Sequence, residues 1–145
     1  MAPLRPTAFS KPLIGWREDI VLPELGNALM IAKIDTGART AALHAEAIAI
    51  KNKRVRFMLL VNVKSCEFNM ALAGTKKVKS SNGISEIRPI IETAIRIGAF
   101  QFDIPITLTD RTDMGVPMLI GRESIKGHFL VNPARSFILS RRKKK

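Results

Sequence analysis

The sequence is poor in cysteine, in tryptophan and in long nonpolar runs. These shortages argue against disulfides, aromatic base stacking and membrane spans, respectively. Cys66 is the only cysteine, so no intrachain disulfide can form and a reducing cytoplasm is the expected compartment. The most nonpolar stretch, residues 28–50, is interrupted by charged side chains and is not a membrane span. Residues 1–12 lack the nonpolar segment of a secretory signal. We therefore expect a cytoplasmic protein without a membrane partner.

Acidic residues are also scarce. The chain has 24 Lys and Arg against 12 Asp and Glu, a net charge of +12, which should attract nucleic acid, anionic membranes or acidic peptides. Base stacking would need aromatic side chains, yet the chain has no tyrosine and one tryptophan. No zinc-finger or RNA-recognition motif occurs either. Nucleic acid is thus a possible partner that the sequence does not favour.

Motifs for metal, nucleotide and thiol chemistry are missing. No His-Glu-x-x-His occurs, and His44, His128 and Cys66 lie far apart in the sequence. No Gly-x-x-x-x-Gly-Lys loop is present to hold ATP. Cys66 lies near Lys64 but has no adjacent histidine, which favours an inert thiol. We expect no metal and no cofactor.

Nonpolar residues make up 46% of the 145 residues, enough for one packed domain. We expect an irregular N-terminal arm over residues 1–12, because it holds three prolines and no periodicity. Residues 13–140 should form the domain, and the five basic residues 141–145 a solvated tail.

Alternation of nonpolar and polar residues indicates β-strands. It is clearest over residues 86–97 and 100–108, and the break at Gly98 and Ala99 predicts a hairpin. Asn82 and Gly83 predict a second hairpin turn, between residues 76–79 and 84–89. Residues 55–61 favour a buried strand, residues 40–50 are ambiguous between helix and strand, and residues 122–126 favour a short helix that ends at Gly127. The predicted class is all-β, a small closed or partly open barrel with one short helix near the C-terminus.

Asp35, Thr36 and Gly37 follow a strand-like run, residues 30–34, and place a carboxylate on a tight turn. Two such carboxylates a few ångströms apart share one proton, so that one donates to a scissile carbonyl while the other activates water. The Thr36 hydroxyl can bond the opposing loop, and Gly37 lets the backbone pass close to it. The alternative is a plain turn, since Asp and Gly are common turn residues.

A second motif, Leu-Ile-Gly-Arg at residues 119–122, ends another nonpolar run. With it, the chain resembles a bacterial family of retropepsin-like aspartic proteases associated with ATP-grasp peptide ligases, which also carries the older label of ATP-dependent zinc protease. The resemblance covers nearly all of residues 14–139 in order, and its clearest segments are residues 14–18, 22–26, 34–45, 108–111, 117–122 and 127–136. It implies an acid-protease barrel, a catalytic role for Asp35, Thr36 and Gly37, and structural support of their turn by Gly121.

Two positions depart from the family pattern. Retroviral members carry an Asp where this chain has Arg39, and that Asp can pair with the arginine that corresponds to Arg122. Arg122 must therefore find another partner here. The nearer family usually has Val-Asp-Pro where this chain has Asn132 between Val131 and Pro133.

Each chain has one Asp-Thr-Gly, so a protease of this kind implies a homodimer. The ligase association implies an acidic, glutamate-rich peptide or protein as substrate, and the basic charge independently favours an anion. The hairpin of residues 76–88 is the expected flap over the cleft. Candidate substrate-binding residues are Ala38, Arg39, Lys79, Ser80, Ser81, Asn82, Gly83, Arg88 and Arg122. The alternative is a catalytically silent barrel that binds peptides or nucleic acid.

Overall fold

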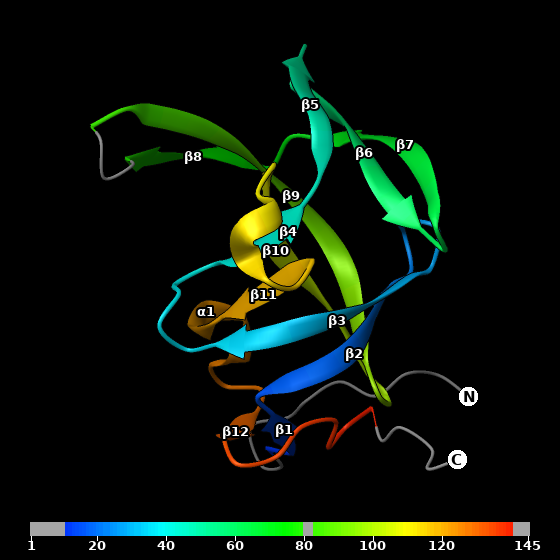
Figure 1. The fold of residues 1–145 in the computed structure, drawn as a ribbon, viewed down its shortest axis with the longest axis vertical. Helices are drawn as coiled ribbons and strands as arrows, with labels where there is room; N and C mark the ends of the chain where they lie inside the picture. The colour runs from blue at the N-terminus through cyan, green and yellow to red at the C-terminus, as the bar shows by residue number, and fades with distance from the viewer. Residues whose placement is uncertain (1–10, 80–82, 141–145) are drawn as a thin grey trace.

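The fold is described from a computed structural model, in which residues 11–79 and 83–140 are placed well enough to describe (Figure 1). Three parts of the sequence-based expectations lie outside these residues. They are most of the N-terminal arm, the hairpin tip at Ser80, Ser81 and Asn82, and the basic tail of residues 141–145.

Six strands close into a barrel, so the predicted all-β class is confirmed. Around the barrel the order is β9, β10, β4, β11, β3 and β2, and β2 pairs with β9 again to complete the circle. The strands are β2 (Arg17–Leu22), β3 (Ala28–Asp35), β4 (Ala41–His44), β9 (Ser85–Ile97), β10 (Phe100–Thr109) and β11 (Met118–Gly121).

The predicted alternation puts nonpolar side chains inside this barrel. Ile91, Ile95 and Ile97 of β9 are fully buried or nearly so, and each of the other barrel strands adds buried nonpolar residues. The turn between β9 and β10 is the predicted one, and Gly98 takes a φ of +58° there, which glycine adopts without strain. Ile87 does not follow the expected inward face: it is 64% exposed, because that end of β9 lies beyond the barrel and pairs with β8 alone.

The second predicted hairpin is also present. β8 (Gly74–Lys79) pairs antiparallel with residues 85–90 of β9, and Gly83 in the connection has a φ of +86°. We call the described residues 74–79 and 83–90 the β8–β9 arm. It projects from the barrel on the side that carries the loop after β3 (Figure 1).

The ambiguous segment 40–50 forms two strands and no helix. Its first half is β4, and its second half is β5 (Glu46–Lys51), which begins a separate antiparallel sheet with β6 (Arg54–Val61) and β7 (Lys64–Ala71). Pairing with neighbouring strands thus outweighs the helix preference of its alanines. The sheet packs on the barrel through buried side chains of β6, chiefly Phe57 and Leu59.

Both ends of the described chain meet below the barrel. β1 (Leu13–Gly15) pairs parallel with β12 (Leu130–Asn132). The fully buried Glu18 holds the last described residues: its carboxylate accepts hydrogen bonds of 2.7–3.2 Å from the N–H groups of Gly15, Ile138, Leu139 and Ser140 and from the Ser140 hydroxyl.

Helical structure is sparse. The predicted short helix is α1 (Arg122–Ile125), and a single turn of 3-10 helix, Thr112–Met114, was not predicted from the sequence. Neither of these helices, nor any other in the described part of the chain, has the length and nonpolar character needed to cross a membrane.

Candidate active site

Asp35 is the last residue of β3 and is half-buried, whereas Thr36 and Gly37 after it are exposed. The Asp35 Oδ1 atom accepts a hydrogen bond of 3.1 Å from the Gly37 N–H, and the Asp35 carbonyl accepts one from the Ala38 N–H, also at 3.1 Å. These two bonds close a tight turn. The carboxylate is therefore held by its own loop through Oδ1.

The start of α1 holds this loop from the other side. The backbone N–H of Arg122 donates to the Ala38 carbonyl at 2.8 Å, and that of Glu123 donates to the Arg39 carbonyl at 3.1 Å. The Arg122 guanidinium donates to the Gly37 carbonyl at 3.4 Å. Arg122, which lacks the family's aspartate partner because Arg39 stands at that position, thus binds the Gly37 carbonyl instead.

Gly121 lies directly behind the loop, because β11 pairs with β3 in a register that sets Gly121 opposite Asp35. A Cβ atom at Gly121 would lie 2.5–2.7 Å from the backbone atoms of Thr40, closer than real Cβ atoms approach. Only glycine therefore allows this packing, and the role of Gly121 in supporting a catalytic turn stays a prediction.

The β8–β9 arm reaches the same loop. The Lys76 ammonium donates to the Thr40 hydroxyl at 2.9 Å, a contact between residues 36 positions apart. No ion pair joins Lys76 to a carboxylate among the described residues. The structure thus places an uncompensated cation at the root of the arm, next to the loop that carries Asp35.

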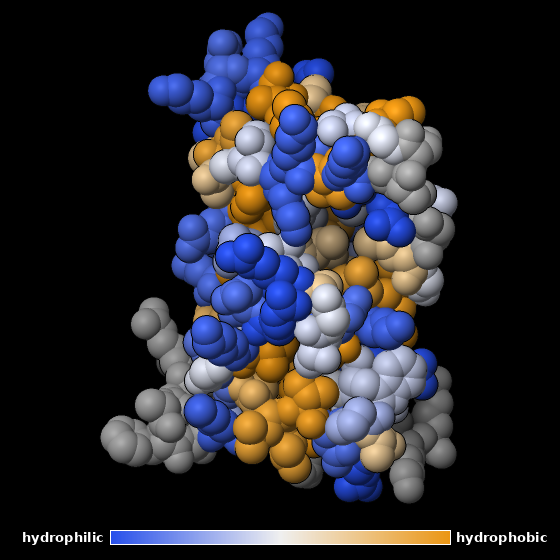
Figure 2. All heavy atoms as spheres, turned by 90° about the vertical axis from the view of Figure 1, so that its left-hand side faces the viewer, coloured by the Kyte–Doolittle hydropathy of each residue, from blue (hydrophilic) through white to orange (hydrophobic). Residues whose placement is uncertain are grey.

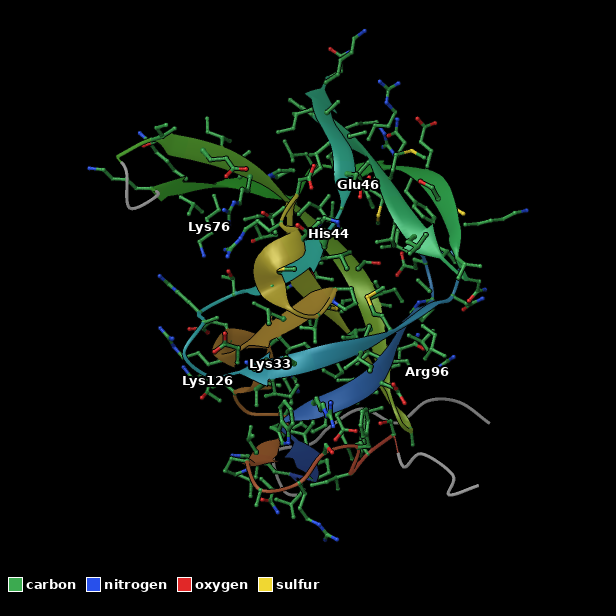
Figure 3. All side chains as sticks on the ribbon, in the orientation of Figure 1. Lys33, His44, Glu46, Lys76, Arg96 and Lys126 are labelled. Carbon is green, nitrogen blue, oxygen red and sulfur yellow. The ribbon has the colours of Figure 1, made fainter. Side chains whose placement is uncertain are left out.

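Further cations surround the loop. Figure 3 shows Lys33 near the end of β3, Lys126 near α1 and Lys76 below the arm. Within residues 11–79 and 83–140, neither Lys33 nor Lys126 pairs with a carboxylate, and the same holds for Arg39 and Arg122. On the side that bears α1 and the loop, Figure 2 shows hydrophilic side chains above a nonpolar patch. The surface around Asp35 is therefore suited to an anion.

The predicted substrate-binding residues are only partly brought together. Ala38, Arg39 and Arg122 lie at the loop, whereas Lys79 and Gly83 lie toward the far end of the arm. Arg88 is less available, because its guanidinium lies 3.3 Å from the Glu86 carboxylate. Sequence reasoning missed Lys33, Lys76 and Lys126; only Lys33 had a usable signal, since it lies two residues before Asp35 and so on the same face of β3.

Two hollows of the described residues bear on the site. A hollow of about 310 Å³ lies beside the loop and is lined by Thr36, Arg122, Glu123, Ile125 and Lys126. A larger cavity, of about 610 Å³, lies elsewhere, between β3 and the β5–β7 sheet, and includes no residue of the Asp35 loop.

The residues considered for zinc do not meet. His128 stacks on Phe102 with the ring centroids 4.8 Å apart, and the Cys66 thiol donates to the Lys64 carbonyl at 3.7 Å. In the described part of the chain, no group of three His, Cys, Asp or Glu side chains is arranged to hold a metal ion.

A closed barrel with an Asp-Thr-Gly loop at the end of one strand, backed by a Gly-Arg turn from the parallel strand beside it, defines the retropepsin-like fold. The chain belongs to the RimB-like family: residues 13–142 match the model of that family, described as retropepsin-like aspartic endopeptidase RimB.

The chain is also similar to a solved structure and to segments of proteins that are named as ligases. The crystal structure of Lpg0085, a Legionella pneumophila protein of unknown function, matches with a TM-score of 0.75 and 31% identity, covering 90% of this chain and 99% of that one. A probable alpha-L-glutamate ligase of Shewanella pealeana is 36% identical over 140 residues, and one of Desulfotalea psychrophila is 29% identical over 134 residues. These matches cover 90% and 87% of this chain but only 30% and 29% of the ligases.

Proposed function

We propose that the protein is an aspartic peptidase that hydrolyses peptide bonds in acidic, glutamate-rich segments, and that it acts as a homodimer. The observation that carries the proposal is the Asp35 loop. Its carboxylate is fixed by its own turn, its backbone is held by α1, and its surroundings are cationic with no carboxylate partners among the described residues.

In the proposed mechanism, the Asp35 carboxyl groups of two protomers lie side by side and share one proton, because two like charges so close cannot both ionise. The ionised carboxylate takes a proton from a bound water, whose oxygen attacks the peptide carbonyl carbon. The protonated carboxyl group gives its proton to the carbonyl oxygen. When the tetrahedral intermediate collapses, the C–N bond breaks and the leaving amine takes a proton.

The charge of the surroundings supports the choice of substrate. Lys33, Lys76, Lys126, Arg39 and Arg122 contribute positive charge around one carboxylate. A glutamate side chain would gain charge-assisted hydrogen bonds there that a neutral side chain would not. The relatives named as probable alpha-L-glutamate ligases point to the same chemistry, since such a ligase would make the glutamate-bearing product that this site would cut.

The proposed dimer has a suitable surface. Leu13 of β1 and Leu130 of β12 are 48% and 56% exposed, and Trp16 beside them is 36% exposed. The Trp16 carbonyl accepts a hydrogen bond from the Ile34 N–H at 2.8 Å, so this nonpolar surface adjoins the residue before Asp35. Burial of such a surface in a two-fold contact would bring the two loops toward each other.

The main experiment compares wild type with Asp35→Asn on a glutamate-rich peptide, with products separated and weighed by mass spectrometry. Wild type should release fragments with a bell-shaped pH profile, and Asp35→Asn should reduce release below detection without changing the circular dichroism spectrum. Asp103→Asn is the matched control, because Asp103 is exposed on β10. Cleavage that survives Asp35→Asn, or that a chelator stops, contradicts the proposal.

The dimer is tested separately. Leu130→Glu should shift sedimentation toward the monomer and lower cleavage together with it, because a charge at a nonpolar contact stays hydrated only if the contact opens. Full activity in a preparation that sediments only as monomer would refute the shared-carboxylate mechanism.

A further inference from the structure

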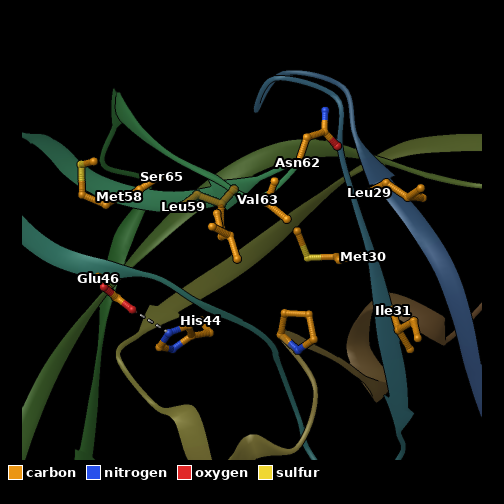
Figure 4. Close-up of a pocket in the computed structure, with 12 residues that line it drawn as sticks. Leu29, Met30, Ile31, His44, Glu46, Met58, Leu59, Asn62, Val63 and Ser65 are labelled. Atoms are coloured by element: carbon orange, nitrogen blue, oxygen red, sulfur yellow. Dashed lines mark ion pairs between the residues drawn. The ribbon is translucent and has the colours of Figure 1, made fainter.

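The larger cavity is a separate feature of this molecule. It has a volume of about 610 Å³ and lies between β3 of the barrel and the strands β6 and β7 of the separate sheet (Figure 4). Cavities that bind ligands in proteins usually measure about 300–1,000 Å³ and are mostly nonpolar, with a few polar groups that orient the ligand. This cavity has that size and that composition.

Its interior is nonpolar and adaptable. Met30 and Met58 contribute to its wall together with Leu59 and Pro117. Methionine side chains are unbranched and polarisable, so they can adjust to nonpolar groups of different shapes. The wall therefore favours a nonpolar group without demanding one particular shape.

The nonpolar surface continues outside the cavity. Leu29, Leu60 and Val63 belong to its lining, yet they are 63%, 66% and 93% exposed. A small molecule seated inside would leave this rim in water. A polypeptide segment that inserts one side chain and lies across the rim would cover both, and exposed nonpolar surface of this kind is typical of protein-binding sites.

One end of the cavity carries negative charge. His44 Nδ1 accepts a hydrogen bond of 3.0 Å from the Arg111 N–H, so the imidazole proton lies on Nε2. Nε2 faces the Glu46 carboxylate at 3.5 Å, as Figure 4 shows, and Asp110 Oδ1 lies 4.0 Å from Nδ1. Two carboxylates thus flank His44 in a chain of net charge +12, and the lining contains no Lys or Arg.

We propose that this cavity binds a segment of a partner protein in which a large nonpolar side chain is followed by Lys or Arg. The nonpolar side chain enters between Met30 and Met58, and the cation meets Glu46 at the end of the cavity. The preference for a basic residue distinguishes this site from the Asp35 surface, which is cationic and suits the opposite charge.

The position of the cavity relative to Asp35 suggests a role in substrate selection. Only this part of the inference rests on the proposed peptidase function. Met30 and Asp35 lie five positions apart on β3, which corresponds to about 17 Å along a strand. Glutamate runs on different proteins are chemically alike, so the Asp35 site alone could not distinguish the proteins that carry them. A second site for the body of that protein would let the peptidase select among acidic substrates.

The test uses Asp35→Asn protein with ¹³C-labelled methionine methyl groups, so that no probe can be cut. The probes are the capped tetrapeptides Gly-Leu-Lys-Gly and Gly-Leu-Glu-Gly. The Lys peptide should shift the methyl signals of Met30 and Met58 and leave that of Met118, which is fully buried in the core, unchanged. Its Kd should be at least about threefold lower than that of the Glu peptide, the range of a partly exposed charge pair.

Charge reversal makes the test specific. Glu46→Lys should reverse the order of the two peptides, and its side chain is 67% exposed, so the substitution is compatible with folding. Glu67→Lys is the matched control, because Glu67 is 60% exposed on β7 and pairs with Arg56 outside the cavity. It should leave the order unchanged.

Four results would overturn the inference: no shift at Met30 or Met58, equal affinity for the two peptides, no reversal in Glu46→Lys, or the same reversal in Glu67→Lys. A shift with n-octylammonium and none with the Lys peptide would assign the cavity to a small amphiphilic cation. Shifts that grow with protein concentration alone would assign it to a second copy of the chain. None of these readouts involves cleavage, so failure of the proposed function leaves them intact.

Discussion

Glu18→Gln should destabilise the protein strongly although it changes almost no volume. The Glu18 side chain is fully buried. Its Oε2 atom accepts hydrogen bonds from Gly15, Ile138 and Leu139, and its Oε1 atom accepts two from Ser140. Five donors thus converge on one carboxylate. A glutamine amide has one acceptor oxygen and one donor NH₂ group, so it can accept only some of these hydrogen bonds.

The magnitude follows from these contacts. The glutamine carbonyl can replace Oε2, and the Ser140 hydroxyl can turn to accept from the amide nitrogen. The Ser140 N–H then faces another donor and loses its bond, while the three remaining bonds are no longer charge-assisted. A bond to a charged group is worth about 1.5–3 kcal/mol and a neutral one about 1 kcal/mol. Because a buried carboxylate costs more to desolvate than an amide, part of this loss is offset. We therefore expect a net loss of about 2–4 kcal/mol, a large part of the roughly 5–15 kcal/mol that stabilises a typical domain.

The assay is urea unfolding followed by the fluorescence of Trp16, the only tryptophan, and by circular dichroism. Trp16 reports on this region because it directly follows Gly15 and its N–H donates to the Arg135 carbonyl at 2.9 Å. Glu92→Gln is the control, since Glu92 is exposed on β9. A free energy of unfolding within about 0.5 kcal/mol of wild type, the scatter of surface substitutions, would refute the reasoning.

Two further substitutions test the contacts around the Asp35 loop. Lys76→Met should raise KM for a glutamate peptide by about tenfold, since it removes a charge at the root of the arm and its bond to Thr40; steady-state kinetics would show this. Gly121→Ala should cost about 1–3 kcal/mol of stability, because the added Cβ meets the Thr40 backbone at 2.5–2.7 Å; urea unfolding would show this, and cleavage should fall with it.

Each of these has a matched control. Lys77→Met removes the same charge from the next position of β8, where the side chain is exposed, so a KM effect equal to that of Lys76→Met would rule out a specific contact. Gly74→Ala places a methyl group 4.0 Å from its nearest neighbour, and a loss of stability as large as that of Gly121→Ala would show that crowding is not the cause.

Local patterns were enough to predict much of this fold. Alternation over residues 86–97 and 100–108, with Gly98 between them, correctly predicted the β9–β10 hairpin, since period and turn chemistry are both local. The Asp-Thr-Gly motif directed attention to Asp35 in the same way, and its catalytic role stays a prediction.

Contacts between distant segments could not be predicted. The parallel pairing of β1 with β12, the bonds of Glu18 to residues 138–140 and the contact of Lys76 with Thr40 depend on how the barrel closes. Residues 40–50 remained ambiguous for the same reason. Their alanines favour a helix locally, and only the strands beside them in the folded chain decide the outcome.

The arm and the barrel wall share a single strand, because β9 continues from Ser85 to Ile97 without a break. Pro89, which has no N–H to donate, lies at the point where β9 begins to pair with β10. A change in the direction of the arm relative to the barrel would therefore bend β9 near this proline.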